Sequence, residues 1–319
     1  MASEALVQAI TRQEWMDPVA DLLQGAVSGA VEKTGATGQA VADALHGTWL
    51  GHPLHPALTD VPVGAWTAAA ALDAIAAARN SEAVDQCATG AIAIGLVGAL
   101  GAAAAGLMDW RHISHQQPRR LGLTHGLLNI GAALLYGTSL IARRRGARGV
   151  GRGLAFLGYA TAGLSAYLGG HLVFEHHLGV DHATEQKPPQ EWTWVMAESD
   201  LPEGEPRRVD VGDARILLLR RGDQILAIGE KCTHLGGPLA EGKLEGDSIV
   251  CPWHGSRFSL EDGHVINGPA VFPERCIETR VRDGQIEVRA GGRGESCQHH
   301  RAQPAPVESE AREMLMTGS

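Results

Sequence analysis

Cys232-Thr233-His234 and Cys251-Pro252-Trp253-His254 are the two segments that decide the fold of this chain. Sixteen residues separate them, and each supplies one cysteine and one histidine. Two thiolates and two neutral imidazoles are the ligands that an iron–sulfur cluster of mixed ligation needs, with the thiolates on one iron and the imidazoles on the other. Glycines and prolines accompany both segments, as in Gly236-Gly237-Pro238 and at Gly255, and they let the backbone turn tightly around a compact cofactor.

This ligand pattern resembles that of the Rieske [2Fe–2S] domain. The resemblance implies that Cys232 and Cys251 hold the inner iron, while His234 and His254 hold the outer, more exposed one. A structural zinc site is one alternative for two cysteines and two histidines, but the spacing differs from that of a zinc finger. Chance placement of these residues in a β-rich domain is the other alternative. The agreement of the two half-motifs, their separation and their Gly/Pro context favours the cluster.

Departures from the Rieske subunits of quinol-oxidising complexes refine the type. Those subunits carry an additional cysteine in each ligand loop, joined as a disulfide, where this chain has Gly237 and Trp253. Ser256 matches a residue that donates a hydrogen bond to a bridging sulfide, but Phe258 replaces a tyrosine that donates to a ligand thiolate. The segment 252–258 is most similar to ferredoxin-type Rieske domains. Because fewer hydrogen bonds to the sulfurs favour the oxidised cluster, we expect a reduction potential in the lower half of the Rieske range of roughly −150 to +300 mV.

The sequence around the ligand segments, residues 192–290, predicts a small all-β domain. Short alternating runs are separated by Gly-Asp and Asp-Gly turns, which is typical of antiparallel strands. A polar linker with prolines precedes this domain at 183–191, and a tail rich in Gly, Glu, Pro and Ser follows it at 291–319, where we expect disorder. The expected strands are 215–220, 224–228, 277–281 and 285–288.

Residues 51–182 predict a bundle of four transmembrane helices. Four apolar segments follow one another, each near the twenty residues that a helix needs to cross a bilayer, and they are rich in Ala and Gly. A buried soluble bundle is the alternative, which four such runs in succession disfavour. The segments are 57–78, 88–109, 123–142 and 153–174. The expected fold class is therefore multidomain: an N-terminal all-α bundle of four transmembrane helices, then an all-β Rieske domain.

The segment Gly51-His52-Pro53-Leu54-His55-Pro56 resembles an uncharacterised bacterial four-helix membrane domain, as does Gly169-Gly170-His171 near the end of the last apolar segment. The resemblance implies a membrane architecture and little else. Residues 1–50 are polar to amphipathic, and apolar residues at helical spacing over 19–31 predict a helix. This helix either lies on the membrane surface, packs on the bundle or is exposed to solvent. Because residues 1–15 lack a signal-peptide pattern, we expect insertion through the later segments.

Composition limits the other classes of function. The chain has 27 basic and 36 acidic residues, a formal net charge of −9, and no basic stripe interleaved with aromatic residues, so nucleic-acid binding has little support. Of the five cysteines, two are assigned to the cluster and three are scattered, which is no disulfide framework.

Histidines gather at one side of the expected bundle. Short loops make successive helices alternate in direction, so face A carries the starts of the first and third segments, the ends of the second and fourth, and the C-terminal domain. Face B carries the loops near residue 79 and over 143–152. Ionisable groups at membrane depth are costly and usually functional, so we expect a second site at face A. Its candidates are His52, His55, Asp60, Asp109, His112, His125, His171 and Glu175; His46, His115, His176, His177 and His182 also fall near this face.

Several interpretations of these residues remain open. His125 and His171 could hold a b-type haem between them. They could instead join His52, His55 and Asp60 around a non-haem metal, or a histidine beside a carboxylate could deprotonate a quinol. In the remaining interpretation the histidines only cap helix ends and meet lipid headgroups.

The function expected from the sequence is that of a membrane-anchored carrier of single electrons, which exchanges them with a partner protein, a quinone or a haem. The first alternative is a Rieske-type oxygenase component with a second iron held by two histidines and a carboxylate. The second is a Rieske domain on an inert membrane anchor.

We expect an integral protein of the bacterial cytoplasmic membrane. The positive-inside rule places the Arg-rich face B in the cytoplasm, whereas the missing disulfide suits a reducing compartment, and we take the cytoplasmic side for the Rieske domain.

Overall fold

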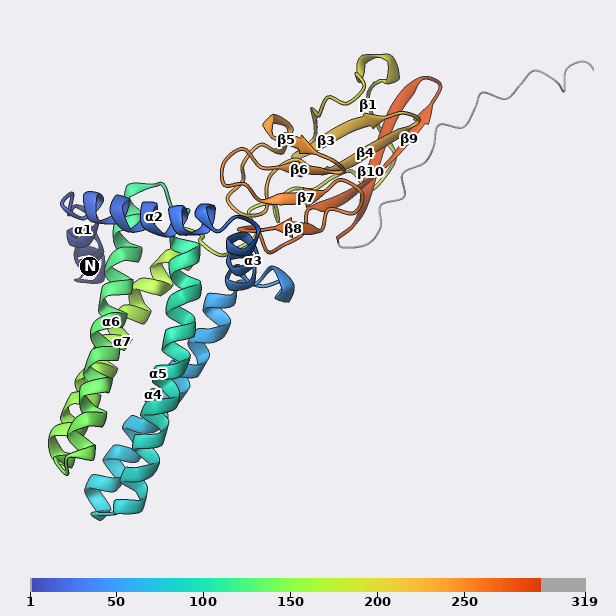
Figure 1. The fold of residues 1–319 in the computed structure, drawn as a ribbon. Helices are drawn as coiled ribbons and strands as arrows, with labels where there is room; N and C mark the ends of the chain where they lie inside the picture. The colour runs from blue at the N-terminus through green and yellow to red at the C-terminus, as the bar shows by residue number, and fades with distance from the viewer. Residues whose placement is uncertain (1, 294–319) are drawn as a thin grey trace, which may run out of the picture. The chain divides into compact units, whose positions relative to one another are not determined.

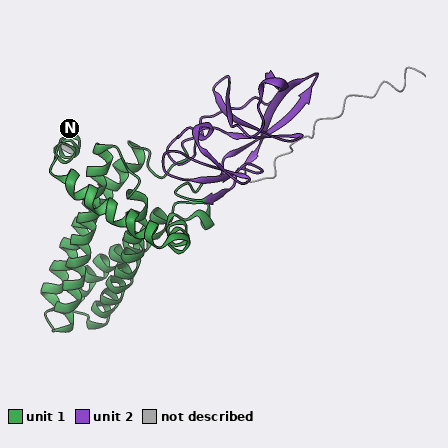
Figure 2. Cartoon of the chain, turned by 45° about the horizontal axis from the view of Figure 1, so that its top comes forward, with its two compact units in different colours: residues 1–181, 267–272 green, residues 182–266, 273–319 purple. Residues whose placement is uncertain are grey.

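Two compact units make up the chain, and each is described by itself (Figures 1 and 2). The computed structural model describes residues 2–293. Unit 1, green in Figure 2, is helical and contains Met1–Asp181 with Asn267–Phe272, and unit 2, in purple, contains His182–Ile266 and the chain from Pro273 onward. Helices followed by strands confirm the expected fold class of an all-α domain before an all-β domain.

Seven α-helices and one 3₁₀ turn build the described part of unit 1, with three short helices before four long ones (Figure 1). The long helices pack as two hairpins, α4 with α5 and α6 with α7. The bounds are α1 Ala2–Thr11, α2 Met16–Lys33, α3 Gly35–His46, η1 Thr48–Leu50, α4 Leu54–Arg79, α5 Glu82–Trp110, α6 Gln116–Arg144 and α7 Arg148–Phe174.

Three of the long helices, α4, α5 and α6, are long and apolar enough to cross a membrane. Only 28%, 28% and 17% of their most apolar stretches are buried within the protein, so most of this apolar surface needs another apolar phase to cover it. The expected fourth span is not confirmed. Helix α7 has 27 residues, but it contains seven glycines and two arginines and is not among the candidate spans.

Glycine lets the helices of the first hairpin approach closely. A Cβ atom at Gly95 would lie 2.2 Å from Trp66 Nε1, and one at Gly98 would lie 2.6 Å from Val61 Cγ1. Trp66 in turn stacks on Tyr136 of α6, with ring centroids 4.3 Å apart, and so joins the two hairpins. Small residues at helix contacts are the usual means by which membrane helices pack.

The helix expected over 19–31 lies within α2, which packs on the ends of the longer helices. Met16 and Ala20 are buried in a cluster with Trp110 and Leu123. The opposite face of α2 exposes 73% of Leu22. This helix therefore presents one apolar face to the bundle and further apolar side chains to its surroundings.

An ion pair fixes α2 to the start of α6. Arg120 Nη2 lies 2.5 Å from Asp17 Oδ2, and Arg119 Nη2 lies 3.3 Å from Asp17 Oδ1. The hydrogen bond from Arg120 holds the pKa of Asp17 low, at about 2. Asp17 is therefore ionised throughout the neutral range.

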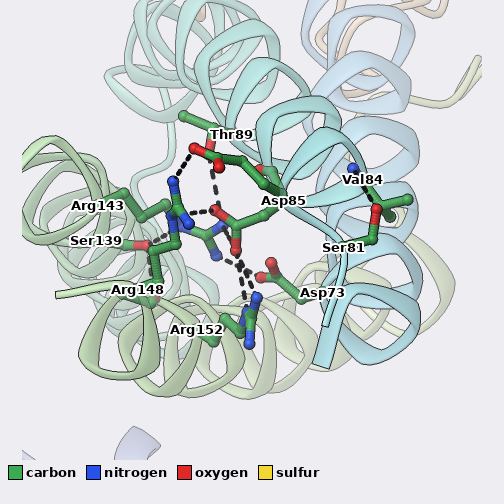
Figure 3. Close-up of polar contacts among 11 residues, drawn as sticks. Asp73, Ser81, Val84, Asp85, Thr89, Ser139, Arg143, Arg148 and Arg152 are labelled. Atoms are coloured by element: carbon green, nitrogen blue, oxygen red, sulfur yellow. Dashed lines mark hydrogen bonds and ion pairs between the residues drawn. The ribbon is translucent and has the colours of Figure 1, made fainter. Parts of the chain in front are cut away.

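A buried network of charged side chains joins all four long helices where each hairpin turns (Figure 3). Arg143 of α6 donates from Nη2 to Asp73 Oδ2 of α4 at 2.5 Å and lies 3.5 Å from Asp85 Oδ1 of α5. Arg152 of α7 lies 2.9 Å from the same Asp85 oxygen. Ser139 Oγ accepts a hydrogen bond from Arg143 Nε at 3.2 Å. Sequence analysis placed the arginines near face B but missed these two aspartates.

Ten strands form two antiparallel sheets in the described part of unit 2 (Figure 1). The six-stranded sheet has the order β1-β10-β9-β4-β3-β2, and the four-stranded sheet has the order β5-β6-β7-β8. The bounds are β1 Thr193–Ala197, β2 Arg207–Val211, β3 Ala214–Arg221, β4 Gln224–Gly229, β5 Lys243–Glu245, β6 Ser248–Val250, β7 Arg257–Ser259, β8 Val265–Asn267, β9 Arg275–Arg282 and β10 Gln285–Arg293.

The four strands expected from alternation are confirmed as parts of β3, β4, β9 and β10. Ile216 and Leu218 of β3 pack in a core with Ile225, Ile277 and Ile286, which belong to the other three strands. Residues 291–293, expected to begin the tail, instead extend β10. The rest of the expected tail, 294–319, lies outside the described residues.

We expect Arg143→Gln to destabilise the helical unit by about 3 kcal/mol, because it leaves the buried Asp73 carboxylate without its cation and removes one of the cations near Asp85. The measurement is the thermal unfolding of the detergent-purified protein, followed by helix circular dichroism. Arg144→Gln is the matched control, since its side chain is exposed at the next position of the same helix. Equal unfolding midpoints for the two variants would show that the network contributes no stability.

Candidate metal centre

Two loops attached to the four-stranded sheet carry the predicted cluster ligands. The first loop leaves β4 after Gly229 and reaches β5 at Lys243, and the second connects β6 with β7. Strands β6 and β7 pair directly, with Val250 opposite Arg257, so the second loop is a closed excursion from a hairpin. An isolated bridge between Lys231 and Pro238 closes the first loop in a similar way.

The backbones of the two loops share one hydrogen-bond pattern. Cys232 N–H donates to the carbonyl of Gly237 at 2.9 Å, and Gly236 N–H donates back to the carbonyl of Cys232 at 2.8 Å. Cys251 N–H donates to the carbonyl of Ser256 at 2.8 Å, and Gly255 N–H donates back to the carbonyl of Cys251 at 3.1 Å. In both loops, the N–H of the cysteine thus donates to the carbonyl of the fifth residue after it. The carbonyl of the cysteine accepts from the N–H of the fourth residue after it.

The fourth residue of each turn is a glycine for a conformational reason. Gly236 has φ of 79° and Gly255 has φ of 77°, in the left-handed region that other L-residues rarely adopt. The repeated turn explains why the sequence places a glycine four residues after each ligand cysteine. Sequence analysis noted these glycines but did not detect the repeated hydrogen bonds.

The four predicted ligands come together in unit 2. Cys232 and Cys251 are buried, with 1% and 3% of their surface exposed, whereas His234 and His254 are partly exposed. The two imidazole rings have centroids 5.0 Å apart and are almost perpendicular. This arrangement of an inner thiol pair and an outer imidazole pair is the donor set that a [2Fe–2S] cluster of mixed ligation requires.

Gly237 lies where the two loops meet. A Cβ atom there would lie 2.8 Å from Cys251 Sγ and 3.1 Å from the Trp253 ring. Positions 237 and 253, where quinol-oxidising subunits carry the additional cysteines, are therefore neighbours in this fold. The space beside Cys251 is open because Gly237 has no side chain. Such a space fits a site shaped around a compact group.

The electrostatics of the ligands suit metal binding. A hydrogen bond between the two thiol groups, and then burial, raise the pKa of Cys232 well above its usual value. The same hydrogen bond lowers the pKa of Cys251 to about 7. Burial lowers the pKa of His254, so its imidazole is neutral at neutral pH and has a lone pair for a metal. Binding of iron would displace the remaining thiol protons.

Two buried carboxylates support the first ligand loop, and sequence analysis missed both. Glu274, from the segment before β9, accepts a hydrogen bond from Thr233 N–H at 2.8 Å, between the two ligands of that loop. Glu230 opens the loop, and burial raises its pKa. No spacing rule connects Glu274 with residue 233, which lies 41 positions earlier, so only the fold could have identified it.

Other predicted residues of the loops differ in exposure. Ser256 and Phe258 are fully buried, whereas Trp253 exposes 57% of its surface. The role of Ser256 as a donor to a bridging sulfide remains a prediction. Trp253 lies beside His254, with ring centroids 6.4 Å apart, so an exposed aromatic ring adjoins a predicted ligand of the outer iron.

The histidines of the helical unit form separate small groups. His55 of α4 and His125 of α6 meet edge to face, with ring centroids 6.1 Å apart. His125 Nδ1 lies 2.8 Å from the carbonyl oxygen of Ser165, and Asn129 Nδ2 lies 3.1 Å from His125 Nε2. His55 Nδ1 lies 2.7 Å from the carbonyl oxygen of Ala102. The His55–His125 pair therefore joins all four long helices, because each ring bonds to the backbone of a further helix.

The remaining candidates of the second site have other partners. His171 lies within hydrogen-bond distance of Tyr167 and Glu175, at 2.7 and 2.6 Å. Asp109 pairs with His46 at 2.7 Å. His112 accepts from Arg111, and His52 Nδ1 lies near the carbonyl of Pro53.

No three His, Cys, Asp or Glu side chains among residues 2–293 form a group that could hold a single metal ion. Asp60 lies on α4, and no hydrogen bond or ion pair among the described residues joins it to the other candidates of the second site. His125 and His171 have the different partners described above, and the haem and second-metal interpretations stay predictions.

Family comparisons agree with both units. Residues 191–282 match the family described as the Rieske [2Fe-2S] domain. Residues 51–182 match the family described as a predicted membrane protein, DUF2231. A solved complex of reduced oxygenase and oxidized ferredoxin in carbazole 1,9a-dioxygenase contains a similar chain; the similarity is 38% identity over 33% of this chain and 99% of that one, with a TM-score of 0.31.

Two curated relatives align with the β unit. Ferredoxin CarAc of Metapseudomonas resinovorans is 40% identical over 100 residues, which are 31% of this chain and 94% of that protein. The cytochrome b6-f complex iron-sulfur subunit of Chlorobaculum tepidum is 32% identical over 90 residues, 28% of this chain and 49% of that protein, so the chain spans about half of it. Since nearly the whole of a ferredoxin aligns at 40% identity, this chain belongs to the Rieske [2Fe–2S] family and carries, before its Rieske domain, a domain of the DUF2231 family of predicted membrane proteins.

Proposed function

We propose that this protein is a membrane-anchored carrier of single electrons. The observation that carries the proposal is the convergence of Cys232, His234, Cys251 and His254 from two turns of the same hydrogen-bond pattern. A bound [2Fe–2S] cluster supplies one-electron oxidation and reduction. The chain supplies the ligands, buries the thiolates and leaves the imidazole side accessible.

The similarity to a ferredoxin favours electron transfer over oxygenation. A Rieske-type oxygenase needs a second iron held by two histidines and a carboxylate, and no observation in this chain favours such a site. The electron partners that we propose are proteins that dock beside Trp253 and His254, or a quinone in the membrane. The exposed indole supports the first of these, because aromatic residues are frequent in interfaces.

We further propose that the protein lies in the bacterial cytoplasmic membrane with its Rieske domain on the cytoplasmic side. The three apolar helices and the DUF2231 match support the membrane. The absence of cysteines at positions 237 and 253 supports a reducing compartment, whereas the disulfide-bonded state of Cys276 weighs against one. The arginines of the opposite loops weigh against this side by the positive-inside rule, although Arg143, Arg148 and Arg152 are paired with acidic residues.

Cys251→Ser is expected to abolish the electron paramagnetic resonance signal of the dithionite-reduced protein, because the inner iron loses a thiolate. The control is His264→Gln, which changes an exposed histidine of the same domain that we do not assign to the cluster. A Rieske signal that survives in Cys251→Ser would contradict the ligand assignment, and loss of the signal in His264→Gln would show that the assay reports general misfolding.

The reduction potential tests the hydrogen bonds around the cluster. We expect the wild-type midpoint in the lower half of the range of roughly −150 to +300 mV. Ser256→Ala should lower it further by roughly 40 mV, the equivalent of about 1 kcal/mol for one electron, because a donor to the reduced cluster is lost. Ser199→Ala, at an exposed serine of the same unit, is the control. A wild-type potential near the top of the range, or no change in Ser256→Ala, would contradict the ferredoxin-type assignment.

A further inference from the structure

From residue 125 onward, the side of α6 that packs on its neighbours carries several polar side chains. They are His125, Asn129, Tyr136, Ser139 and Arg143, with Ala132 between them and Leu140 packed against the Trp66–Tyr136 rings. Polar side chains inside membrane helices are costly and usually mark ion or proton pathways. The stretch from residue 125 to residue 143 rises about 27 Å at 1.5 Å per residue, close to the roughly 30 Å of a bilayer core.

The other three long helices contribute to the same polar column. At one end, His125 meets His55 of α4 and the Ser165 backbone of α7. At the other end, Arg143 meets Asp73 of α4 and Asp85 of α5 (Figure 3). The titratable and charged groups that face the column are His55 and Asp73 on α4, Asp85 on α5, His125, Tyr136 and Arg143 on α6, and Arg152 on α7.

Three buried polar atoms, two in the middle of the column and one at its Arg143 end, have no hydrogen-bond partner among the described residues. They are Trp66 Nε1, Tyr136 Oη and Asp73 Oδ1. These residues are 4%, 1% and 8% exposed. An unsatisfied polar atom costs several kcal/mol in an apolar medium, so such atoms are retained where water or another ligand meets them.

The geometry suits water and protons better than a larger ligand. Trp66 and Asp73 are seven residues apart on α4, as Tyr136 and Arg143 are on α6, so the stacked rings and the ion pair lie two helical turns apart. Helix side chains lean toward the N-terminus, so the Tyr136 ring covers the turn of Ala132. Asp73 holds Arg143 through Oδ2, which leaves Oδ1 as a proton acceptor.

We propose that the interior of the helical unit is a hydrated path for protons, from the Asp73–Asp85–Arg143 network past Tyr136 to the His125–His55 pair. A proton that enters at one end is passed along water and the side-chain oxygens and nitrogens, and one leaves at the other end. No electron or other reactant is needed. This activity is separate from electron carriage by the Rieske unit and does not depend on it.

The test uses the full-length, cluster-containing protein in liposomes that enclose a pH-sensitive dye. A potassium gradient with valinomycin drives protons inward, and the rate of internal acidification is compared with that of protein-free liposomes. Wild-type protein should accelerate acidification, and Tyr136→Phe should reduce the protein-dependent rate by about tenfold or more, as expected when one member of a relay is removed. Tyr167→Phe, at an exposed tyrosine of α7 whose hydroxyl bonds to His171 and not to a member of the column, should conduct like the wild type.

Tyr136→Phe separates conduction from stability. The hydroxyl has no partner in the protein, so its removal loses no internal hydrogen bond and should not lower the unfolding temperature. Asp73→Asn is the second variant. The electron paramagnetic resonance signal of its reduced cluster checks that the protein is intact. Wild-type liposomes no faster than protein-free ones, equal rates for Tyr136→Phe and wild type, or a parallel leak of sodium ions would each overturn the proposal.

Discussion

Two glycine-closed turns determine what the β unit can hold. In each turn a cysteine N–H bonds to the fifth residue and a left-handed glycine N–H bonds back to the cysteine carbonyl. The repeated geometry brings both thiols inward and both imidazoles outward, although the ligand pairs are far apart in sequence. The strands around them form the frame, since the pairing of β6 with β7 sets the second turn and Glu274 fixes the first. Without the glycines at 236 and 255, neither turn could close in this way.

The helical unit depends on a different constraint, which is that polar groups inside a membrane bundle must find partners. Arg143 satisfies this at one end by bridging Asp73 and Asp85, so one side chain links three helices. At the other end His55 and His125 bond to backbone carbonyls. Between these ends Tyr136 stacks on Trp66 but leaves its hydroxyl without a protein partner. Apolar side chains at the same positions would carry no desolvation cost.

Much of the β unit was predictable because its signals are local. Ligand spacing, the glycines after each cysteine, and alternation in the strands all lie within a few residues of one another, and the predicted strands fall within β3, β4, β9 and β10. Glu274 was not predictable, because its bond to Thr233 spans 41 positions and follows from the fold alone. In the helical unit, length and hydropathy identified the long helices but not which histidines meet. One of several interpretations of the sequence paired His125 with His171; in the structure the His125 ring meets His55, and His171 bonds to Glu175. The expected fourth span is not confirmed, because the most apolar stretch of glycine-rich α7 is less apolar than those of the other three long helices.

The most direct measurement of the central claim is a Mössbauer spectrum of the oxidised protein grown on ⁵⁷Fe. Two iron sites of equal area with clearly different isomer shifts are expected, because one iron has only sulfur ligands and the other has two imidazoles. Two indistinguishable sites would indicate ligation by cysteine alone. A protein that holds zinc in place of iron would contradict the assignment of a Rieske cluster to these four residues.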